Sequence, residues 1–286
     1  MDPFRDRVAI ITGGGSGIGA AMARAFSTRG ARLVLADVDE AAMARVEAEL
    51  RAGGTDVLCV RTDVSKRAEV EHLADTAVRH FGAVHVVCNN AGIATFGEMA
   101  KAPHEDWEFA MRVNFWGVVH GVEAFVPRLL ARGQGGHVVN TASMAGLVGM
   151  RWLGIYCASK FAVAGLTEAL HRELEPQGIG VTLLCPMIVA TNINENSVRL
   201  RPEHLRSESP RPPPPPAGAL QGGTVTADDV AARVARAIDG KKLYVLTHPE
   251  QRDLLRRRAS KLDQVFEEWD SVMPWRDCVG RSPGRL

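Results

Sequence analysis

The sequence lacks three features that would point toward other classes of protein: an excess of charge, paired cysteines and a long apolar run. Its 34 basic and 33 acidic residues leave a formal charge of +1, so no broad field attracts nucleic acid or an anionic membrane. The longest uncharged apolar stretches, such as 181–190, are shorter than the roughly 18 residues of a membrane span. Residues 1–7 are charged and lead straight into a strand, so we expect no signal peptide and a cytoplasmic protein without nucleic-acid or membrane partners.

The cysteines are few, odd in number and far apart in the sequence. No Cys-x-x-Cys pair is present to hold a metal or form a redox disulfide, so we expect no metal site. Most lie in apolar surroundings, which favours small buried thiols in a reducing compartment. The five positions are Cys59, Cys88, Cys157, Cys185 and Cys278.

Short apolar strands alternate with helical patterns along most of the chain. Alternation of this kind predicts an α/β fold with one doubly wound, Rossmann-type parallel sheet of about seven strands and helices on both faces. We expect a single domain over residues 1–286, with a tail at 249–286. The predicted strands are 8–11, 32–37, 56–61, 84–88, 136–143, 180–185 and 243–246, and the predicted helices are 40–51, 66–81, 103–132, 155–175 and one from about 228.

A glycine-rich turn, Thr12 to Gly19, follows the first strand and opens the first helix. Glycines let the backbone approach a pyrophosphate, and the helix offers unpaired N–H groups. Asp37 stands about 20 residues further on, where a carboxylate binds adenosine ribose hydroxyls. Neither Ser16 nor Val38 supplies a cation for a 2′-phosphate, so NAD is favoured over NADP. The alternative for the glycine turn is a tight connection that binds no ligand. The alternative for Asp37 is a carboxylate that only caps the next helix.

Two further loops follow strands at the edge of the sheet where ligands bind. Asp63 follows the third strand, and we expect it near the adenine. The run Asn89-Asn-Ala-Gly92 follows the fourth strand, and its small residues would let a flat group lie on the backbone. A simple turn is the alternative for this run.

Tyr156 and Lys160 are four residues apart in a predicted helix, so their side chains leave one face of it. An ammonium near a phenol favours the phenolate and lowers its pKa. Ser143 ends a predicted strand and could hold a substrate oxygen. Asn114, inside a helix, either satisfies a neighbouring carbonyl or binds a water beside Lys160. An isolated Tyr-x-x-x-Lys pair would be weak support for catalysis, since such spacing recurs by chance.

Together these motifs resemble those of the short-chain dehydrogenases/reductases over residues 5–193, with a weaker similarity at 226–246. The motifs occur in family order: Thr12-Gly-x-x-x-Gly-x-Gly19, Asp63, Asn90-Ala-Gly92, Asn114, Ser143, Tyr156-x-x-x-Lys160 and Pro186.

The resemblance implies four catalytic residues: Tyr156 as general acid or base, Lys160 lowering its pKa, Ser143 orienting the substrate oxygen and Asn114 holding a proton-relay water. It also implies that the dinucleotide contacts Tyr156 and Lys160 together with Gly13, Ser16, Gly17, Ile18, Gly19, Asp37, Val38, Asp63, Val64, Asn90, Ala91, Gly92, Val113, Pro186, Val189 and Thr191.

The substrate pocket departs from the family pattern, because Met187 follows Pro186 where family members often have glycine. The expected pocket surrounds Ser143 and Tyr156, with ordinary core packing as the alternative for each wall residue. A wall of this kind favours a hydrophobic alcohol or ketone. The wall candidates are Met144, Trp152, Leu153 and Met187.

We expect residues 187–225 to form a substrate lid, because five consecutive prolines at 212–216 cannot continue a helix or a central strand. A ligand for a proline-recognition domain is the rival interpretation. Residues 249–271 read as an amphipathic helix that packs on its own domain or on a neighbouring subunit rather than a membrane. Residues 243–249 faintly resemble bacterial members of the family that oxidise benzylic alcohols in aryl ethers.

The sequence therefore predicts an NAD-dependent oxidoreductase that interconverts a hydrophobic secondary alcohol and its ketone. The alternatives are an NADP-preferring carbonyl reductase, an epimerase or dehydratase that returns its hydride, and a dinucleotide sensor without turnover. The resemblance also implies a homo-oligomer, a tetramer or a dimer.

Overall fold

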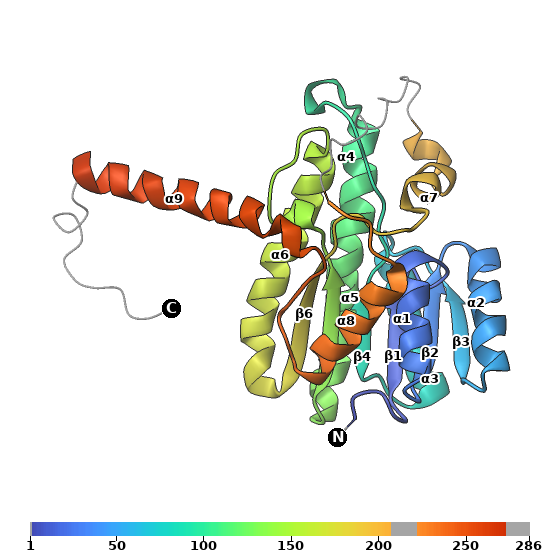
Figure 1. Cartoon of the computed structure of the whole chain (residues 1–286). Helices are drawn as coiled ribbons and strands as arrows, with labels where there is room; N and C mark the ends of the chain where they lie inside the picture. The colour runs from blue at the N-terminus through green and yellow to red at the C-terminus, as the bar shows by residue number, and fades with distance from the viewer. Residues whose placement is uncertain (1, 207–221, 273–286) are drawn as a thin grey trace. The chain divides into compact units, whose positions relative to one another are not determined.

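The structure is a computed structural model that describes residues 2–206 and 222–272. Seven parallel strands form one sheet in the order β3-β2-β1-β4-β5-β6-β7 (Figure 1). The chain therefore starts in the middle of the sheet, builds one half outward, and crosses from β3 to β4 to build the other. The strands are β1 (Val8–Thr12), β2 (Arg32–Asp37), β3 (Val57–Arg61), β4 (Val86–Asn89), β5 (Gly136–Thr141), β6 (Ile179–Cys185) and β7 (Tyr244–Leu246).

Helices cover both faces of this sheet, which confirms the predicted doubly wound α/β fold (Figure 1). Residues of α1, α2 and α8 share one hydrophobic cluster with the strands, and residues of α3, α5 and α6 share the other. The helices are α1 (Gly17–Ser27), α2 (Glu40–Ala52), α3 (Arg67–Phe81), α4 (His104–Ala110), α5 (Gly117–Arg132), α6 (Gly154–Leu174), α7 (Ile193–Arg199), α8 (Ala227–Asp239) and α9 (Arg252–Val272), with a π-helix over Met111–Trp116 between α4 and α5.

The central strands are apolar on both faces because helices cover them on both sides. Every residue of β1 and of β6 is buried, including their few polar ones. Thr182 of β6 shows how a polar side chain is accommodated there: its hydroxyl contacts His137 Nε2 at 2.8 Å and donates to the Lys242 carbonyl at 2.7 Å. Hydrophobic burial and paired polar groups thus fix the frame that carries the site.

Several predicted boundaries differ from the structure in ways that affect the site. β5 ends at Thr141, so Ser143 lies in the connection beyond the strand, in extended backbone just before a 3₁₀ turn. The single helix expected over 103–132 contains a π-helical turn around Asn114. The expected lid contains a helix, α7, and its proline run at 212–216 lies outside the described residues.

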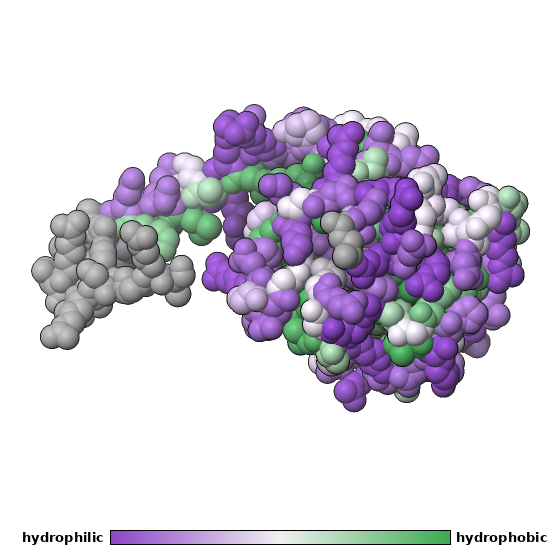
Figure 2. Space-filling model, turned by 90° about the horizontal axis from the view of Figure 1, so that it is seen from below, coloured by the Kyte–Doolittle hydropathy of each residue, from purple (hydrophilic) through white to green (hydrophobic). Residues whose placement is uncertain are grey.

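The chain forms two compact units, Met1–His248 and Pro249–Leu286. The first holds the whole sheet, and the described part of the second consists of a short 3₁₀ turn and α9. The face seen from below in Figure 2 is mostly hydrophilic, with smaller hydrophobic groups between the polar residues. Within residues 2–206 and 222–272, no helix is long and apolar enough to cross a membrane.

Candidate active site

A cavity of about 640 Å³ lies along the carboxyl ends of the strands. Gly13 after β1, Asn90 after β4 and Pro186 after β6 all line it, together with residues of α7. The cavity spans the point between β1 and β4 where the strand order reverses. Open parallel sheets bind their ligands at this place, because the loops on either side of it diverge and leave a crevice.

One end of the cavity is built by the glycine turn and the first turn of α1. Ser16 caps this helix without a side-chain hydrogen bond, and no acidic residue occupies the first turn. The turn is tight: a Cβ on Gly19 would lie 2.1 Å from the Gly13 carbonyl oxygen. Free N–H groups, a positive helix end and bare backbone fit the pyrophosphate of a dinucleotide.

Asp37 stands beside this turn at the end of β2. Its Oδ2 accepts a hydrogen bond from the Gly15 amide at 2.9 Å, and its Oδ1 accepts one from the Asp39 amide at 3.0 Å. These bonds fix the carboxylate on the cavity wall. A fixed negative charge there suits neutral ribose hydroxyls and repels a phosphate.

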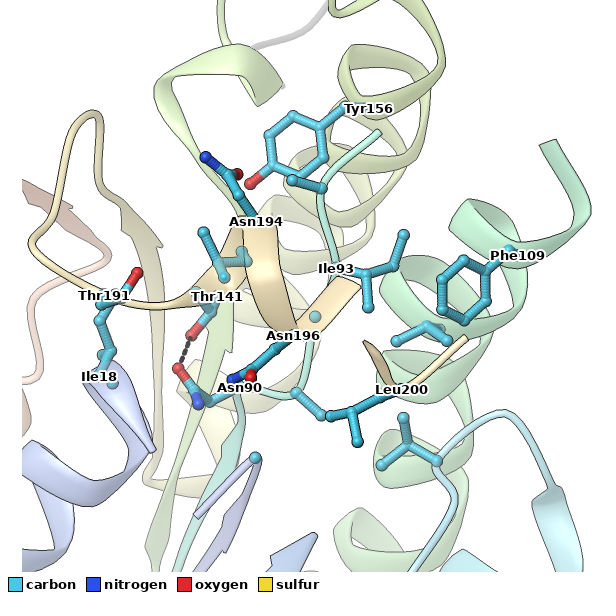
Figure 3. Close-up of a pocket in the computed structure, with 18 of the residues that line it drawn as sticks. Ile18, Asn90, Ile93, Phe109, Thr141, Tyr156, Thr191, Asn194, Asn196 and Leu200 are labelled. Atoms are coloured by element: carbon cyan, nitrogen blue, oxygen red, sulfur yellow. Dashed lines mark hydrogen bonds between the residues drawn. The ribbon is translucent and has the colours of Figure 1, made fainter. Parts of the chain in front are cut away.

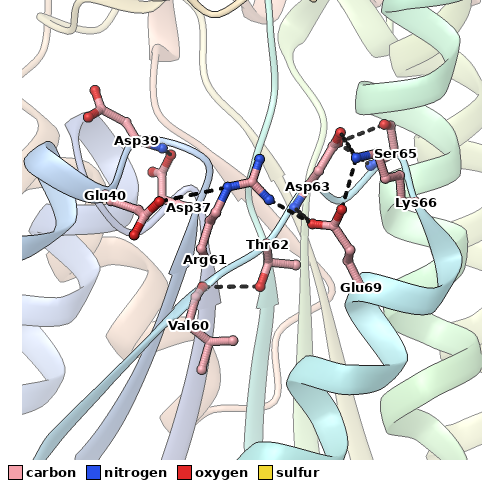
Figure 4. Close-up of polar contacts among 10 residues, drawn as sticks. All are labelled: Asp37, Asp39, Glu40, Val60, Arg61, Thr62, Asp63, Ser65, Lys66 and Glu69. Carbon is pink, nitrogen blue, oxygen red and sulfur yellow. Dashed lines mark hydrogen bonds and ion pairs between the residues drawn. The ribbon is translucent and has the colours of Figure 1, made fainter.

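Arg61 also lines the cavity near Asp37, but acidic neighbours surround its guanidinium (Figure 4). Its Nη1 lies 3.2 Å from Glu69 Oε2, and its Nε lies 3.9 Å from Glu40 Oε1. Asp63 Oδ1 accepts hydrogen bonds from the Ser65 amide and hydroxyl. The region is therefore an ion-pair network rather than an unpaired cationic patch.

Asn90 connects three strands at the centre of the cavity. Its Nδ2 donates to the Thr12 carbonyl at 3.0 Å, and its Oδ1 accepts from the Thr141 hydroxyl at 3.2 Å (Figure 3). The Thr12 hydroxyl accepts from the amides of Asn90 and Ala91. These hydrogen bonds anchor the loop after β4, and Ala91 and Gly92 of this loop line the cavity.

The other end of the cavity brings together Ser143, Tyr156 and Lys160. Tyr156 and Lys160 leave the same face of α6, and Lys160 Nζ lies 5.6 Å from the centroid of the Tyr156 ring. Ser143 Oγ accepts a hydrogen bond from the Ala145 amide at 3.1 Å and lies 3.2 Å from the Pro186 carbonyl. A hydroxyl, a phenol and an amine in one cavity can orient a substrate oxygen and move a proton to or from it.

Burial controls the charge of both groups on α6. It raises the pKa of Tyr156 to about 12, although hydrogen bonding with Ser143 acts in the opposite direction. Burial also lowers the pKa of Lys160 to about 8. In this structure desolvation of the phenolate is the largest cause of the raised pKa of Tyr156, and the lowering of that pKa by Lys160 stays a prediction.

Asn114 holds the loop that follows Gly92. Its Oδ1 accepts from the Ile93 amide at 2.9 Å, and its Nδ2 donates to the Ile93 carbonyl and to the Ser159 hydroxyl. A Cβ on Gly92 would lie 3.2 Å from Asn114 Oδ1 and 3.4 Å from Lys160 Nζ, so the three residues meet at one point. The π-helical turn around Asn114 is a distortion that is frequent at functional sites.

Comparison with known proteins identifies the family. The family model for short chain dehydrogenases matches residues 7–201. The chain belongs to the short-chain dehydrogenase family.

Relatives of this short-chain dehydrogenase include a C alpha-dehydrogenase of Sphingobium, 34% identical over 96% of this chain and 89% of the relative. A 1-deoxy-11-beta-hydroxypentalenate dehydrogenase of Streptomyces exfoliatus is 36% identical over 94% of this chain and 90% of the relative. A Burkholderia phymatum short chain dehydrogenase/reductase solved in complex with NAD superposes with a TM-score of 0.86, at 42% identity over 92% of this chain and 96% of that chain. These similarities make the protein an oxidoreductase of this family.

The structure places nearly all sequence-predicted site residues of this short-chain dehydrogenase on the cavity, and four of them elsewhere. Gly19 packs against Gly13, and Asn114 lies behind Gly92. Met144 is only 1% exposed, and Trp152 turns toward Arg151, whose guanidinium lies 4.7 Å from the indole centroid. Neither Met144 nor Trp152 lines the cavity, so this part of the pocket prediction is corrected.

Other apolar lining residues were missed because they belong to segments without a motif. A periodic apolar position reads equally well as core, and only the fold shows which such positions border a cavity. The missed residues include Ile93, Phe96, Phe109, Met150, Leu200 and Leu205. Among the described residues, no three His, Cys, Asp or Glu side chains are grouped as a metal site would require.

Proposed function

We propose that the protein is an NAD-dependent dehydrogenase that interconverts a hydrophobic secondary alcohol and its ketone. The observation that carries this proposal is the position of Ser143, Tyr156 and Lys160 at one end of a cavity whose other end has the features of a dinucleotide site. When bound, the nicotinamide accepts or supplies the hydride.

In alcohol oxidation, Ser143 holds the substrate oxygen and Tyr156 takes its proton. The side chain of Lys160 donates a hydrogen bond to the Thr141 carbonyl at 2.9 Å, which keeps the amine beside the phenol. In ketone reduction the phenol returns the proton. Asn114 keeps the loop beside Lys160 in place, and we assign it the proton-relay water as well.

The preference for NAD rests on Asp37 and on the ion pairs of Arg61 with Glu40 and Glu69. A 2′-phosphate beside Asp37 would meet a fixed carboxylate, and Arg61 would have to give up its partners to neutralise it. The NAD complex of the Burkholderia relative supports the same choice. The contacts of Gly13, Val38, Asp63 and Val113 with the dinucleotide belong to this proposal.

The hydrophobic substrate class rests on apolar residues that line the same cavity as Ser143, which include Ile93, Phe96, Leu153 and Met187. The names of the Sphingobium and Streptomyces relatives, both dehydrogenases, are consistent with an alcohol substrate. A panel of aryl, terpenoid and aliphatic alcohols, followed by NADH absorbance at 340 nm with NAD or NADP, tests the proposal. We expect NADH with at least one hydrophobic alcohol; no reduction of either coenzyme across the panel would contradict it.

We also infer a homo-oligomer in the cytoplasm. The side chains of Trp116 and Leu130, both in the unit Met1–His248, are 48% and 41% exposed. An interface between subunits would cover such apolar side chains. Free thiols at Cys59, Cys88 and Cys185 are consistent with a reducing compartment. Sedimentation analysis of the purified protein tests the oligomer; a monomer at micromolar concentration would contradict it.

A further inference from the structure

Helix α9 carries an apolar face that the described part of its own unit does not cover. That part consists of a 3₁₀ turn and the helix itself, so it offers no second element to pack against the face. Residues three or four apart in a helix share one side of it, and a row of exposed apolar side chains there marks an interaction surface. The face consists of Leu262, Val265, Phe266 and Trp269, which are 50%, 47%, 74% and 62% exposed.

The charged residues of α9 are separated along the helix instead of being mixed. This order opposes the helix dipole, whose positive end is the N-terminus. It also places like charges four residues apart, as in Arg257 and Lys261 or Asp263 and Glu267, where they repel. The charges therefore do little to stabilise the helix alone, and their complement lies outside it. Apart from Asp253, which lies 3.6 Å from Arg256, the first half is basic, with Arg252, Arg256, Arg257, Arg258 and Lys261, and the second half is acidic, with Asp263, Glu267 and Glu268.

A second copy of the same helix, running in the opposite direction, supplies that complement. Its acidic half lies beside the basic half of the first copy, and the two helix dipoles oppose each other. A two-fold axis requires a surface that is complementary to itself, and a helix with opposite charges in its two halves meets this requirement. A parallel pair would instead place the two basic halves together. An anionic membrane would attract the basic half and repel the acidic one.

We propose that α9 pairs with α9 of a second copy of this chain as an antiparallel two-helix coiled coil. This contact adds an interface to the homo-oligomer inferred above and does not depend on the reaction. When the two-fold axis passes the middle of the apolar face, Leu262 packs against Val265 of the second copy. Arg258, on the same stripe one turn before Leu262, then faces the Trp269 ring of the second copy, where a cation–π contact is favourable. In this register Lys261 is displaced by only about 3 Å along the axis from Glu268 of the second copy.

One aspartate placed on either side of α9 tests the use of the apolar face. Phe266→Asp puts a charge on the face, and Ser260→Asp puts the same side chain on the opposite, exposed side as a matched control. Sedimentation equilibrium at micromolar concentration measures the mass of the full-length proteins, and urea denaturation checks that each is folded. We expect Phe266→Asp to have half the wild-type mass and Ser260→Asp to keep the wild-type mass, with the same urea midpoint in all three.

Charge reversal tests the direction of the pairing. Lys261→Glu and Glu268→Lys each bring like charges together across the two-fold axis, so we expect each to raise the dissociation constant of the assembly by about tenfold. The double variant has opposite charges again at this contact, and we expect it to associate as the wild type does. Within one helix the two positions are about two turns apart, so an effect inside the helix cannot cause this recovery.

Several results would overturn the inference. An oligomer whose mass is the same in Phe266→Asp would contradict pairing through α9 and leave the homo-oligomer standing, whereas a wild-type monomer would contradict both. A double variant as weak as the single ones would contradict the antiparallel direction. Phosphatidylcholine–phosphatidylglycerol vesicles that bind the wild type but not Phe266→Asp, with no change in mass, would make a membrane the occupant of the face. None of these measurements uses turnover, so the proposed reaction is tested separately.

Discussion

Lys160 Nζ lies 5.6 Å from the centre of the Tyr156 ring and donates its hydrogen bond to the Thr141 carbonyl, not to the phenol. The amine thus lies under the ring, while the hydroxyl is free to meet Ser143 and the substrate. Desolvation lowers the pKa of Lys160 to about 8 and raises the pKa of Tyr156 to about 12.

The buried amine of Lys160 predicts a stability that depends on pH. Its pKa lies below the value of an unfolded lysine, so between about pH 8 and pH 10.5 the unfolded chain binds more protons than the folded one. Stability from this group therefore rises with pH across that window, and the cost of burying the charge is fully present below pH 8. We expect Lys160→Met to gain stability relative to wild type at pH 7 and to lose that gain by pH 10.

Urea denaturation of both proteins at each pH measures this difference. Tyr156 acts in the opposite sense above pH 10, because its raised pKa removes stability as the unfolded phenol ionises first. The comparison is therefore made between pH 7 and pH 10. A difference between the two proteins that does not change with pH would contradict the charged, desolvated lysine.

Asp37 predicts a change in coenzyme preference. Replacing Asp37 with Ser and Val38 with Arg removes the carboxylate beside the ribose and adds a cation for a 2′-phosphate. We expect the ratio of kcat/KM for NADP to that for NAD to rise by about 100-fold, equivalent to two favourable charged hydrogen bonds. Val38→Arg alone is the control and should give a smaller change. An unchanged ratio in the double variant would remove the basis for NAD preference.

The buried pair Asp106–Arg201 predicts strong coupling between α4 and the lid. Asp106→Ala leaves the Arg201 charge buried without its partner, so we expect a loss of about 3 kcal/mol in stability. The double variant with Arg201→Met should lose less than Asp106→Ala alone. Urea denaturation and the rate of trypsin cleavage after Arg199 and Arg206 measure both effects. Equal losses in the single and double variants would show that the pair does not hold the lid.

Two Gly→Ala substitutions are predicted to differ in their effect on NAD binding, because only one of them lies in the glycine turn. A Cβ at Gly19 would overlap the Gly13 carbonyl, so Gly19→Ala should distort the turn and weaken NAD binding at least tenfold. Gly165 lies in α6 with open space around it, and Gly165→Ala should raise stability by about 0.5–1 kcal/mol without changing NAD affinity. Calorimetric titration with NAD measures both affinities. Normal binding by Gly19→Ala would place the dinucleotide elsewhere.

Features that depend on a short stretch of sequence could be predicted from the sequence alone. Buried parallel strands are continuous apolar runs, and the glycine turn, Asp37 and the Tyr156–Lys160 spacing each follow from a bond or a close approach that the chemistry needs. The parallel sheet and the residues around the glycine turn could be predicted for this reason. Their joint order along the chain also allowed the family to be recognised.

Other features depend on contacts between distant segments, which no local pattern encodes. The pairing of Asp106 with Arg201 joins residues 95 positions apart. Met144 and Leu153 both have apolar side chains, yet only Leu153 lines the cavity, because Met144, in the 3₁₀ turn after Ser143, is buried in the interior. The opposing effects of burial and of the Ser143 hydrogen bond on the Tyr156 pKa likewise require the folded environment.

The most direct test of the account is a comparison of wild type with Tyr156→Phe in two measurements, NADH formation from the best alcohol of the panel and NAD affinity by titration. The ring and its packing are kept, and only the hydroxyl that moves the proton is removed. We expect turnover to fall by at least about 1,000-fold, while the NAD dissociation constant changes by less than about threefold. Turnover by Tyr156→Phe at the wild-type rate would contradict the central claim that this phenol transfers the proton.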